Sequence, residues 1–322
     1  MAVQGYQPEF KDFEERGTAV VFRLMEMIRI GMSTSCVYPQ PTEHTFRLAA
    51  LAGYDGVEIM VTNDEGTQDA DGLLKLAREY DLSILSIHAP VLLLTQRVWG
   101  RDPKVKLEKS AELAAAVGAG TVVVHPPFRW QAGYAHNFLG IVRDVSARYG
   151  VEIAVENMFP WKVAGMSLTA YAPSSDPSVM DCDAMTLDFS HAALSGRDSL
   201  ELAMAMGPHL RHVHLCDGSG SMGEGKIFDE HLLPGRGNEP VAEVLQYLVN
   251  QDWDGTIVAE VNTRKARTEQ ERLEMLSETL AFAQDKLGVS RRGHARRYSG
   301  SEFPGIIRRA SRRALTALRP AR

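Results

Sequence analysis

The chain has 322 residues, 44% of them hydrophobic, and a formal net charge of −6 at pH 7. This length suits one large α/β domain or two ordinary ones. No apolar run approaches the roughly 20 residues that a membrane-spanning helix needs. Residues 1–18 are polar and acidic and lack the basic start and apolar core of a secretory signal. We therefore expect a soluble protein.

The three cysteines, Cys36, Cys182 and Cys216, follow no paired spacing. This pattern argues against a disulfide framework and for a reducing compartment. A cytoplasmic location is the corresponding expectation.

The charge is unevenly distributed along the chain. Residues 290–322 contain ten arginines and one acidic residue, Glu302, so this segment carries +9 and residues 1–289 carry −15 of the total of −6. An acidic body is poorly suited to binding a phosphate backbone. Within 306–318, apolar residues recur at helical spacing between pairs of arginines, which is a basic amphipathic pattern. We interpret 289–322 as an Arg-rich tail that is either poorly ordered or helical and docked on the acidic body. Contact with a membrane surface or nucleic acid is the alternative.

Short β-branched runs alternate with helix-length segments along most of the chain. We expect an N-terminal extension at 1–27, with a helix near 20–27, and no domain boundary before about 288. The predicted strands lie at 28–33, 56–60, 82–88, 121–125, 151–156, 185–188, 210–214 and 256–260. The predicted helices include 70–80, 103–117, 135–149, 199–206, 240–250 and 269–287.

Eight strands that alternate with helices predict right-handed βαβ units and a parallel sheet. A doubly wound sheet usually has fewer strands and carries a glycine-rich fingerprint in its first turn, which this sequence lacks. The predicted fold class is therefore α/β, with a single (β/α)8 TIM barrel over residues 28–288.

Six consecutive predicted strands end in a histidine or an acidic residue. From the third strand to the eighth, these residues are His88, His125, Glu156, Asp188 with His191 shortly after it, His214 and Glu260. The carboxyl ends of barrel strands face one mouth, so these side chains should converge. Imidazoles and carboxylates without thiolate clusters suit Zn²⁺, Mn²⁺, Fe²⁺ or Co²⁺. Burying three carboxylates together without a cation is costly, so the sequence predicts at least one divalent metal site.

The segment 214–237 extends the last part of this pattern. After His214 it has a glycine-rich loop, then Asp229 and His231, and then a Gly-Arg-Gly turn. We interpret it as a metal-binding loop. Three further residues receive other roles: an interior barrel layer for His212, core packing for Cys216 and, for Glu58 on the second strand, either the mouth or a supporting salt bridge.

The motifs HAP, VVHP, VEN, LDxxH, VHLxD, DxH with a following GxG, and AEV occur in this order. Together they resemble the xylose-isomerase-like TIM-barrel superfamily, over roughly residues 28–287. That superfamily includes sugar-phosphate isomerases and epimerases, ketose 3-epimerases, inosose dehydratases and endonuclease IV abasic-site nucleases.

Resemblance to the ketose epimerases implies one divalent metal held by Glu156, Asp188, His214 and Glu260. It also implies that His191 contacts substrate and that Arg236 is a counterpart of a substrate-anchoring arginine. Glu156 and Glu260 would flank the sugar, one removing a proton and the other returning it, through an enediolate. We also predict substrate binding by His88 and by the loop aromatics Trp130 and Trp161, which could stack on a sugar ring.

Resemblance to endonuclease IV implies three zinc ions held by nine residues. This chain has a matching residue at every position: His88, His125, Glu156, Asp188, His191, His214, Asp229, His231 and Glu260. Other features depart from the nuclease pattern. The first strand reads GMSTSC, the fifth strand continues as ENMFPWKV, and the body is acidic.

The function predicted is a metal-dependent sugar or sugar-phosphate isomerase or epimerase. Its cofactor is a divalent metal, zinc or manganese, as one ion and up to three. The alternatives are an endonuclease IV-like trinuclear-zinc phosphodiesterase, an inosose-dehydratase-like lyase, and a non-catalytic barrel that interacts through its tail. The expected partner is a small-molecule carbohydrate, nucleic acid is disfavoured, no membrane span is expected, and a homo-oligomer is compatible with the sequence.

Overall fold

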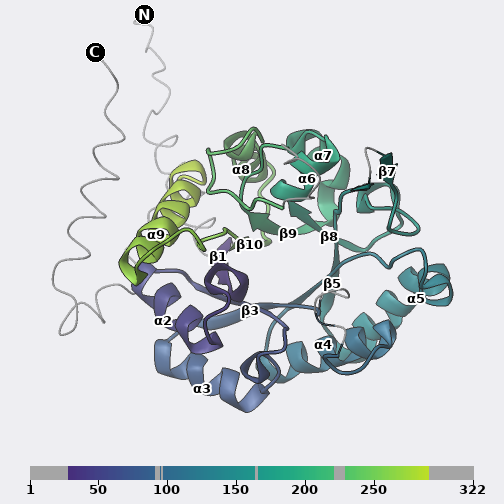
Figure 1. Ribbon diagram of the computed structural model, residues 1–322, viewed down its shortest axis with the longest axis horizontal. Helices are drawn as coiled ribbons and strands as arrows, with labels where there is room; N and C mark the ends of the chain where they lie inside the picture. The colour runs from purple at the N-terminus through teal and green to yellow at the C-terminus, as the bar shows by residue number, and fades with distance from the viewer. Residues whose placement is uncertain (1–27, 91–94, 96, 164–165, 221–228, 290–322) are drawn as a thin grey trace, which may run out of the picture.

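The computed structural model describes residues 28–90, 95, 97–163, 166–220 and 229–289 (Figure 1). The helix expected near 20–27 and the Arg-rich segment 290–322 lie outside these residues. Among the helices that are described, none is long and apolar enough to cross a bilayer.

Eight parallel strands close into a barrel in the order β1-β10-β9-β8-β5-β4-β3-β2. Each predicted strand is present, with its ends displaced by no more than one residue. The predicted TIM barrel is therefore confirmed. The strands are β1 (Arg29–Ser33), β2 (Gly56–Met60), β3 (Ser83–His88), β4 (Thr121–Val124), β5 (Glu152–Glu156), β8 (Ala184–Asp188), β9 (Leu210–Leu215) and β10 (Thr256–Ala259).

Helices form a ring around the outside of the barrel (Figure 1). The predicted helices are found as α3 (Ala70–Tyr80), α4 (Pro103–Val117), α5 (Ala132–Tyr149), α7 (Ser199–Met206), α8 (Val241–Asn250) and α9 (Glu269–Lys286). Short 3-10 helices lie at η1 (Thr34–Val37), η2 (Glu65–Thr67), η3 (Pro177–Val179) and η4 (Gly207–His209).

Two helices were not predicted, α2 (Thr42–Ala52) and α6 (Phe189–Ser195). Helix α2 begins after Pro41, which makes no side-chain capping bond, so the usual start signal is missing. Helix α6 has only 7 residues, too few to show helical periodicity. It begins at the end of β8, where the Asp188 carboxylate accepts a hydrogen bond from the backbone N–H of His191 at 2.7 Å.

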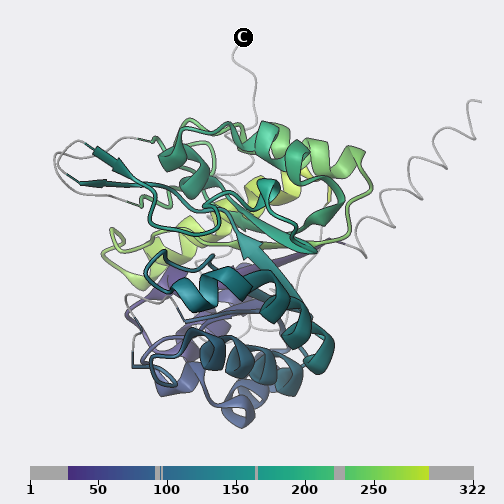
Figure 2. The ribbon, with the colours of Figure 1, turned by 90° about the vertical axis from the view of Figure 1, so that its right-hand side faces the viewer.

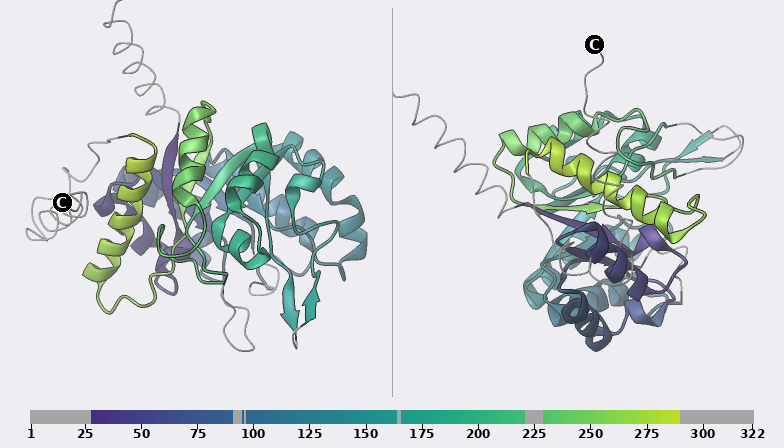
Figure 3. Two further views of the ribbon diagram at one scale, coloured as in Figure 1. Left: turned by 90° about the horizontal axis from the view of Figure 1, so that it is seen from above. Right: turned by 90° about the vertical axis from the view of Figure 1, so that its left-hand side faces the viewer.

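An antiparallel hairpin also went unpredicted. Its strands are β6 (Trp161–Val163) and β7 (Met166–Leu168), and it belongs to the connection between β5 and β8. The hairpin projects from the body of the barrel in both side views (Figures 2 and 3). Strands of three residues are shorter than the runs from which sequence patterns identify strands.

The barrel interior contains polar as well as apolar side chains. On β9, His212 and His214 share a face because side chains alternate along a strand, and both are fully buried. The Nε2 of His212 lies 3.0 Å from a carboxylate oxygen of Glu58, which is also fully buried. The expected interior position of His212 is confirmed. Cys216 is buried too, and burial raises the pKa of its thiol, as expected for a packed side chain.

Cys36, which follows β1, makes contacts with the chain at the end of the last barrel strand, β10. Its thiol donates to the carbonyl oxygen of Ala259 at 3.1 Å and accepts from the N–H of Val261 at 3.3 Å. Its own carbonyl accepts a hydrogen bond from the Thr263 hydroxyl. These contacts fix the chain on both sides of Glu260, the residue directly after β10.

A single buried carboxylate organises the loop after β9. The Oδ1 of Asp217 accepts from the N–H groups of Gly218 (2.8 Å) and Glu239 (3.2 Å). Its Oδ2 accepts from those of Gly235 and Gly237, both at 2.9 Å. A Cβ atom on Gly237 would lie 2.3 Å from Oδ1, so the turn requires glycine there. The Gly-Arg-Gly turn therefore wraps around Asp217 and returns the chain to α8.

Replacement of Asp217 by alanine should destabilise the protein. The change leaves four backbone N–H groups without their acceptor, and hydrogen bonds to charged groups contribute roughly 1.5–3 kcal/mol each, so we expect the free energy of unfolding to fall by about 3 kcal/mol or more. Urea denaturation followed by circular dichroism measures the change. Asp181→Ala is the control, because the Asp181 side chain is 90% exposed and its carboxylate pairs with Arg143 at the surface. A denaturation midpoint for Asp217→Ala as close to wild type as that of the control would contradict the assignment.

Candidate metal centre

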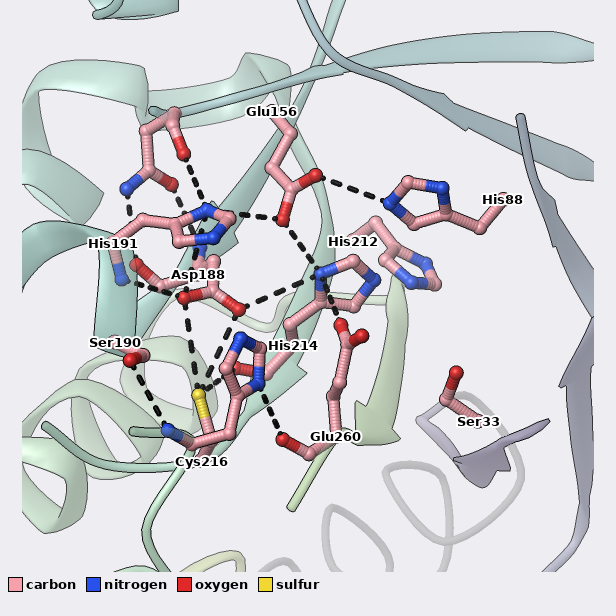
Figure 4. Close-up of polar contacts among 12 residues, drawn as sticks. Ser33, His88, Glu156, Asp188, Ser190, His191, His212, His214, Cys216 and Glu260 are labelled. Carbon is pink, nitrogen blue, oxygen red and sulfur yellow. Dashed lines mark hydrogen bonds and ion pairs between the residues drawn. The ribbon is translucent and has the colours of Figure 1, made fainter. Parts of the chain in front are cut away.

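Histidine and acidic side chains gather at the carboxyl ends of the barrel strands. Figure 4 shows the buried members pointing toward one another. His88, Glu156 and Asp188 are the last residues of their strands. His125 and Glu260 directly follow a strand, and His214 is the next-to-last residue of β9.

Four of these residues form the centre of the group. Ligand atoms of Glu156, Asp188, His214 and Glu260 all lie within 4.8 Å of one another, and the four residues are buried. The Nδ1 atom of His214 is 2.9 Å from Glu156 Oε1, 3.0 Å from Glu260 Oε2 and 3.7 Å from Asp188 Oδ2. Three carboxylates and one imidazole converging in this way are a donor set that fits a divalent cation such as zinc or manganese.

Glu156 links this centre to two further histidines. Its Oε2 lies 3.3 Å from His88 Nε2 and 2.9 Å from His125 Nε2, whereas its Oε1 faces His214. The Nδ1 of His88 lies 2.9 Å from the carbonyl oxygen of Ala89, which orients the ring so that Nε2 faces Glu156. Glu156 therefore connects the two groups: its Oε1 faces the four-residue centre and its Oε2 faces His88 and His125.

Asp229 links the centre to the remaining two histidines. Its Oδ2 is 3.1 Å from His191 Nε2 and 2.9 Å from His231 Nε2. The hydroxyl of Ser190 donates to its Oδ1 at 2.6 Å. Ligand atoms of Asp188, His191 and His231 form another group within 4.8 Å. The structure thus brings all nine residues of the predicted polynuclear set into one connected cluster.

His231 holds its position through an unusual backbone conformation. Its φ is +43°, in the left-handed region that residues other than glycine seldom adopt. Its carbonyl oxygen accepts from the N–H of Asn262 at 2.8 Å, and its Nδ1 lies 2.7 Å from the carbonyl oxygen of Glu260. Such strain tends to occur at functional sites.

Asn157 positions two members of the cluster, a role that the sequence did not suggest although the residue belongs to the VEN motif. Its Oδ1 accepts from the N–H of Asp188 at 2.7 Å, and its Nδ2 donates to the Asp188 carbonyl at 3.0 Å. The carbonyl oxygen of Asn157 lies 2.9 Å from His191 Nδ1. The Nε2 of His191 is left facing Asp229.

Mutual interactions shift the pKa values of the cluster in opposite directions. Burial alone would raise the pKa of the Glu156 carboxyl, but His214 and His125 hold it well below its usual value. Glu260, also against the effect of burial, has its pKa lowered to about 2 by His214. Burial would lower the pKa of His214, but Glu260, Glu58 and Glu156 raise it well above its usual value. At neutral pH, carboxylates and protonated imidazoles therefore neutralise one another in the metal-free site.

The predicted substrate-binding residues are not all close to this cluster. The guanidinium of Arg236 is exposed and pairs with Glu278 on α9, so the structure does not bring it to the cluster. Trp130 is 60% exposed and stacks on Phe128, with 4.3 Å between ring centroids, and Trp161 lies 5.8 Å from Trp130.

The aromatic group approaches the candidate metal ligands through one residue. Phe159 belongs to the same apolar cluster as Phe128 and Trp161. Its ring centroid lies 5.0 Å from that of His191. The aromatic surface around Trp130 and Trp161 therefore borders the candidate metal centre.

The chain belongs to the xylose isomerase-like TIM barrel family, whose profile matches residues 46–285. The resemblance inferred from the motifs is thus confirmed. Among its relatives, an uncharacterised protein of Mycobacterium bovis is 46% identical over 279 residues, which cover 81% of this chain and 98% of the relative.

Two more distant proteins are also similar to this chain. The fructoselysine 3-epimerase of Escherichia coli O157:H7 is 22% identical over 261 residues, covering 73% of this chain and 91% of that protein. A crystal structure of the IolI protein with a bound zinc atom has a TM-score of 0.59 and 17% identity, covering 81% of this chain and 98% of the other.

Metal binding should release protons and strengthen with rising pH. The pKa values of His191, His214 and His231 are all raised well above the usual value against the effect of burial, so these imidazoles carry protons at neutral pH without metal. A metal ligand needs the lone pair, so a cation must displace them, and we expect about one proton or more released per zinc bound at pH 7. Zinc titration calorimetry in two buffers of different ionisation enthalpy measures the release. His209→Ala, at an exposed residue outside the cluster, should leave the release unchanged; zinc uptake without proton release would contradict this protonation state.

Proposed function

We propose that this protein is a metal-dependent isomerase or epimerase of a sugar or sugar phosphate. The main supporting observation is the placement of two glutamates around one point. Glu156 on β5 and Glu260 after β10 approach His214 Nδ1 to 2.9 and 3.0 Å, and two barrel strands, β8 and β9, separate β5 from β10. The carboxylates therefore enter the mouth from different sides, as proton transfer on two faces of a substrate requires.

Glu156, Asp188, His214 and Glu260 would hold the metal. Their donor types and mutual distances fit a divalent ion, and their burial leaves three carboxylates in need of a cation. When bound, the ion acts as a Lewis acid that polarises a substrate carbonyl and makes the neighbouring C–H bond more acidic. The zinc atom in the IolI structure and the activity of the fructoselysine epimerase support this proposal.

The proton itself moves between the two glutamates and the substrate. One carboxylate removes a proton from the carbon beside the carbonyl, which gives an enediolate, and the other returns a proton from the opposite face. Each carboxylate has two oxygens, so one can serve as a metal ligand while the other faces the substrate. The result is an inverted carbon or a migrated carbonyl.

Other residues would bind and orient the sugar. His191 and His88 would contact substrate oxygens. A backbone carbonyl on one nitrogen orients each ring, which supports this role. Trp130 and Trp161 offer aromatic faces to a sugar ring beside the mouth. An anchoring role for Arg236 would require its guanidinium to leave Glu278.

Substitution of either glutamate should abolish proton exchange. We expect Glu156→Gln and Glu260→Gln to lower the rate of deuterium incorporation from D₂O into a reactive ketose by roughly 100-fold or more, because each removes a general base. NMR on a panel of ketoses, ketose phosphates and an inosose measures this rate and would also reveal loss of water, the lyase alternative.

Glu152→Gln is the matched control. Glu152 begins β5, at the opposite end of the strand from Glu156, and pairs with Arg211. This variant should exchange deuterium at the wild-type rate. Wild-type exchange in Glu156→Gln or Glu260→Gln with metal retained would reject the two-glutamate mechanism.

One observation favours a second candidate function. Asp229 lies between His191 and His231, and His88 and His125 add further donors around Glu156, so the cluster has enough ligands for up to three zinc ions. Such a site could hydrolyse a phosphodiester. The charge of −15 on residues 1–289 works against DNA binding.

The number of metal ions separates the two functions. We expect elemental analysis of the purified protein to give about one divalent ion per chain, and His231→Ala to leave that number unchanged, because the four-residue centre does not include His231. About three zinc ions per chain, together with incision of an abasic-site duplex that His231→Ala abolishes, would instead establish the phosphodiesterase.

A further inference from the structure

Glu58 is a buried carboxylate that the proposed mechanism does not use. It lies in the middle of β2, not at the end of a strand, and is fully buried inside the barrel. Its Oε2 accepts a hydrogen bond from the hydroxyl of Ser86 on β3 at 2.8 Å and lies 3.0 Å from His212 Nε2. Its Oε1 lies 3.3 Å from His214 Nε2.

The two ring nitrogens of His214 therefore face different carboxylates. Nδ1 faces Glu156 and Glu260 in the candidate metal centre, and Nε2 faces Glu58 across the barrel interior. A neutral imidazole has one donor nitrogen and one acceptor nitrogen. An ionised carboxylate only accepts hydrogen bonds, so contact with Glu58 requires the proton to be on Nε2. When a cation displaces the proton on Nδ1, that nitrogen directs its lone pair at the centre.

We propose that Glu58 is a positioning residue for the metal centre. It fixes the orientation of His214 and the tautomer with the proton on Nε2, so that Nδ1 is the metal ligand. A carboxylate that accepts from the second nitrogen of a ligating histidine is a common support of metal sites. The inference rests on the metal-binding part of the proposed function and is independent of the sugar chemistry.

The surroundings of Glu58 match this role. Ser86 is its direct neighbour in the register of β2 and β3, and the hydroxyl holds the carboxylate from the side away from β9. In the order of the barrel, β1 and β10 separate β2 from β9, so the carboxylate reaches His214 through the interior and not from an adjacent strand. His212 and His214 present their Nε2 atoms to it together.

A metal ion held by Glu58 itself is the competing interpretation. Ligand atoms of Glu58, His212 and His214 also lie within 4.8 Å of one another. Such an ion would occupy Nε2 of His214, and the same ring could then serve the centre at Nδ1 only as an imidazolate. The positioning role and this second site therefore predict different states of one nitrogen atom.

The first test reads that atom in the unaltered protein. NMR of the full chain labelled with ¹⁵N-histidine and loaded with zinc should show His214 with Nδ1 bound to zinc and a proton on Nε2. The His214 signal is assigned by its shift in Glu58→Gln. A zinc-bound Nε2, or an Nε2 without a proton, would overturn the proposal. The state of the atom is read in the wild-type protein, and the variant serves only to assign the signal.

The second test measures zinc affinity by competition with a chelator. Glu58→Gln keeps the size of the side chain and the acceptor for Ser86 but removes the charge, and we expect the zinc dissociation constant to rise by roughly 10- to 100-fold. The visible absorption spectrum of the Co²⁺-loaded protein should change as well, because the ligand orientation is altered. Glu58→Asp, which keeps the charge on a shorter side chain, should recover part of the affinity.

Asp55→Asn is the matched control. Asp55 precedes β2 at the other end of the barrel, where its carboxylate accepts from the N–H of Ile30 at 2.8 Å. The variant makes the same change in net charge without touching His214, so zinc affinity and the Co²⁺ spectrum should stay as in the wild type. Equal affinity in Glu58→Gln and wild type, or loss of a second zinc in Glu58→Gln, would overturn the positioning role.

These outcomes are separable from failure of the proposed function. Zinc binding that Glu58→Gln weakens, without deuterium exchange into any sugar, would reject the isomerase and retain the role of Glu58. Deuterium exchange into a sugar by the wild type, with unaltered zinc affinity in Glu58→Gln, would retain the isomerase and reject the role of Glu58. A wild-type chain that binds no divalent metal would reject both.

Discussion

Neutralisation of four buried carboxylates is the constraint on which this structure depends. Glu58, Glu156, Asp188 and Glu260 lie in the interior and mouth of one barrel, where isolated anions are strongly disfavoured. His214 lies within 3.7 Å of an oxygen atom of each of them. Its ring is therefore the common partner of groups that come from four different strands or strand ends. A protonated imidazole in the free protein and a divalent cation in the loaded protein would answer the same electrostatic demand.

The barrel and the composition of the site followed from the sequence because one physical rule connects them. Strands covered on both faces are continuous apolar runs, as in β4, and the polar residue after such a run marks the mouth. Parallel topology then requires that all these residues meet, which the cluster around Glu156 and His214 confirms. Elements outside this rule were missed. Helix α6 is short, and among the described strands β6 and β7 pair only with each other, outside the barrel sheet.

The directions of individual side chains could not be predicted from the sequence. Arg236 matches the position of a substrate-anchoring arginine in the motif, but the turn around Asp217 directs its side chain toward Glu278 on α9. Glu58, in contrast, does reach the site, although the residue pattern left its direction open. The pairing of β2 with β3 shifts register between Val57 and Glu58, and such an irregularity leaves no trace in the residue pattern. The left-handed backbone of His231 is likewise a product of its tertiary contacts.

The amide of Asn157 has a consequence for how this protein can diverge. Its two hydrogen bonds with the Asp188 backbone clasp the ends of β5 and β8, which are neighbours in the barrel. The connection between β5 and β8, which we call the excursion, includes Trp161 and the hairpin that projects from the body (Figure 2). Because both ends of the excursion are held at two candidate metal ligands, its length and sequence can vary while Glu156 and Asp188 stay in place. Selection for new substrates can therefore act on the excursion as an exchangeable part, separately from the chemistry.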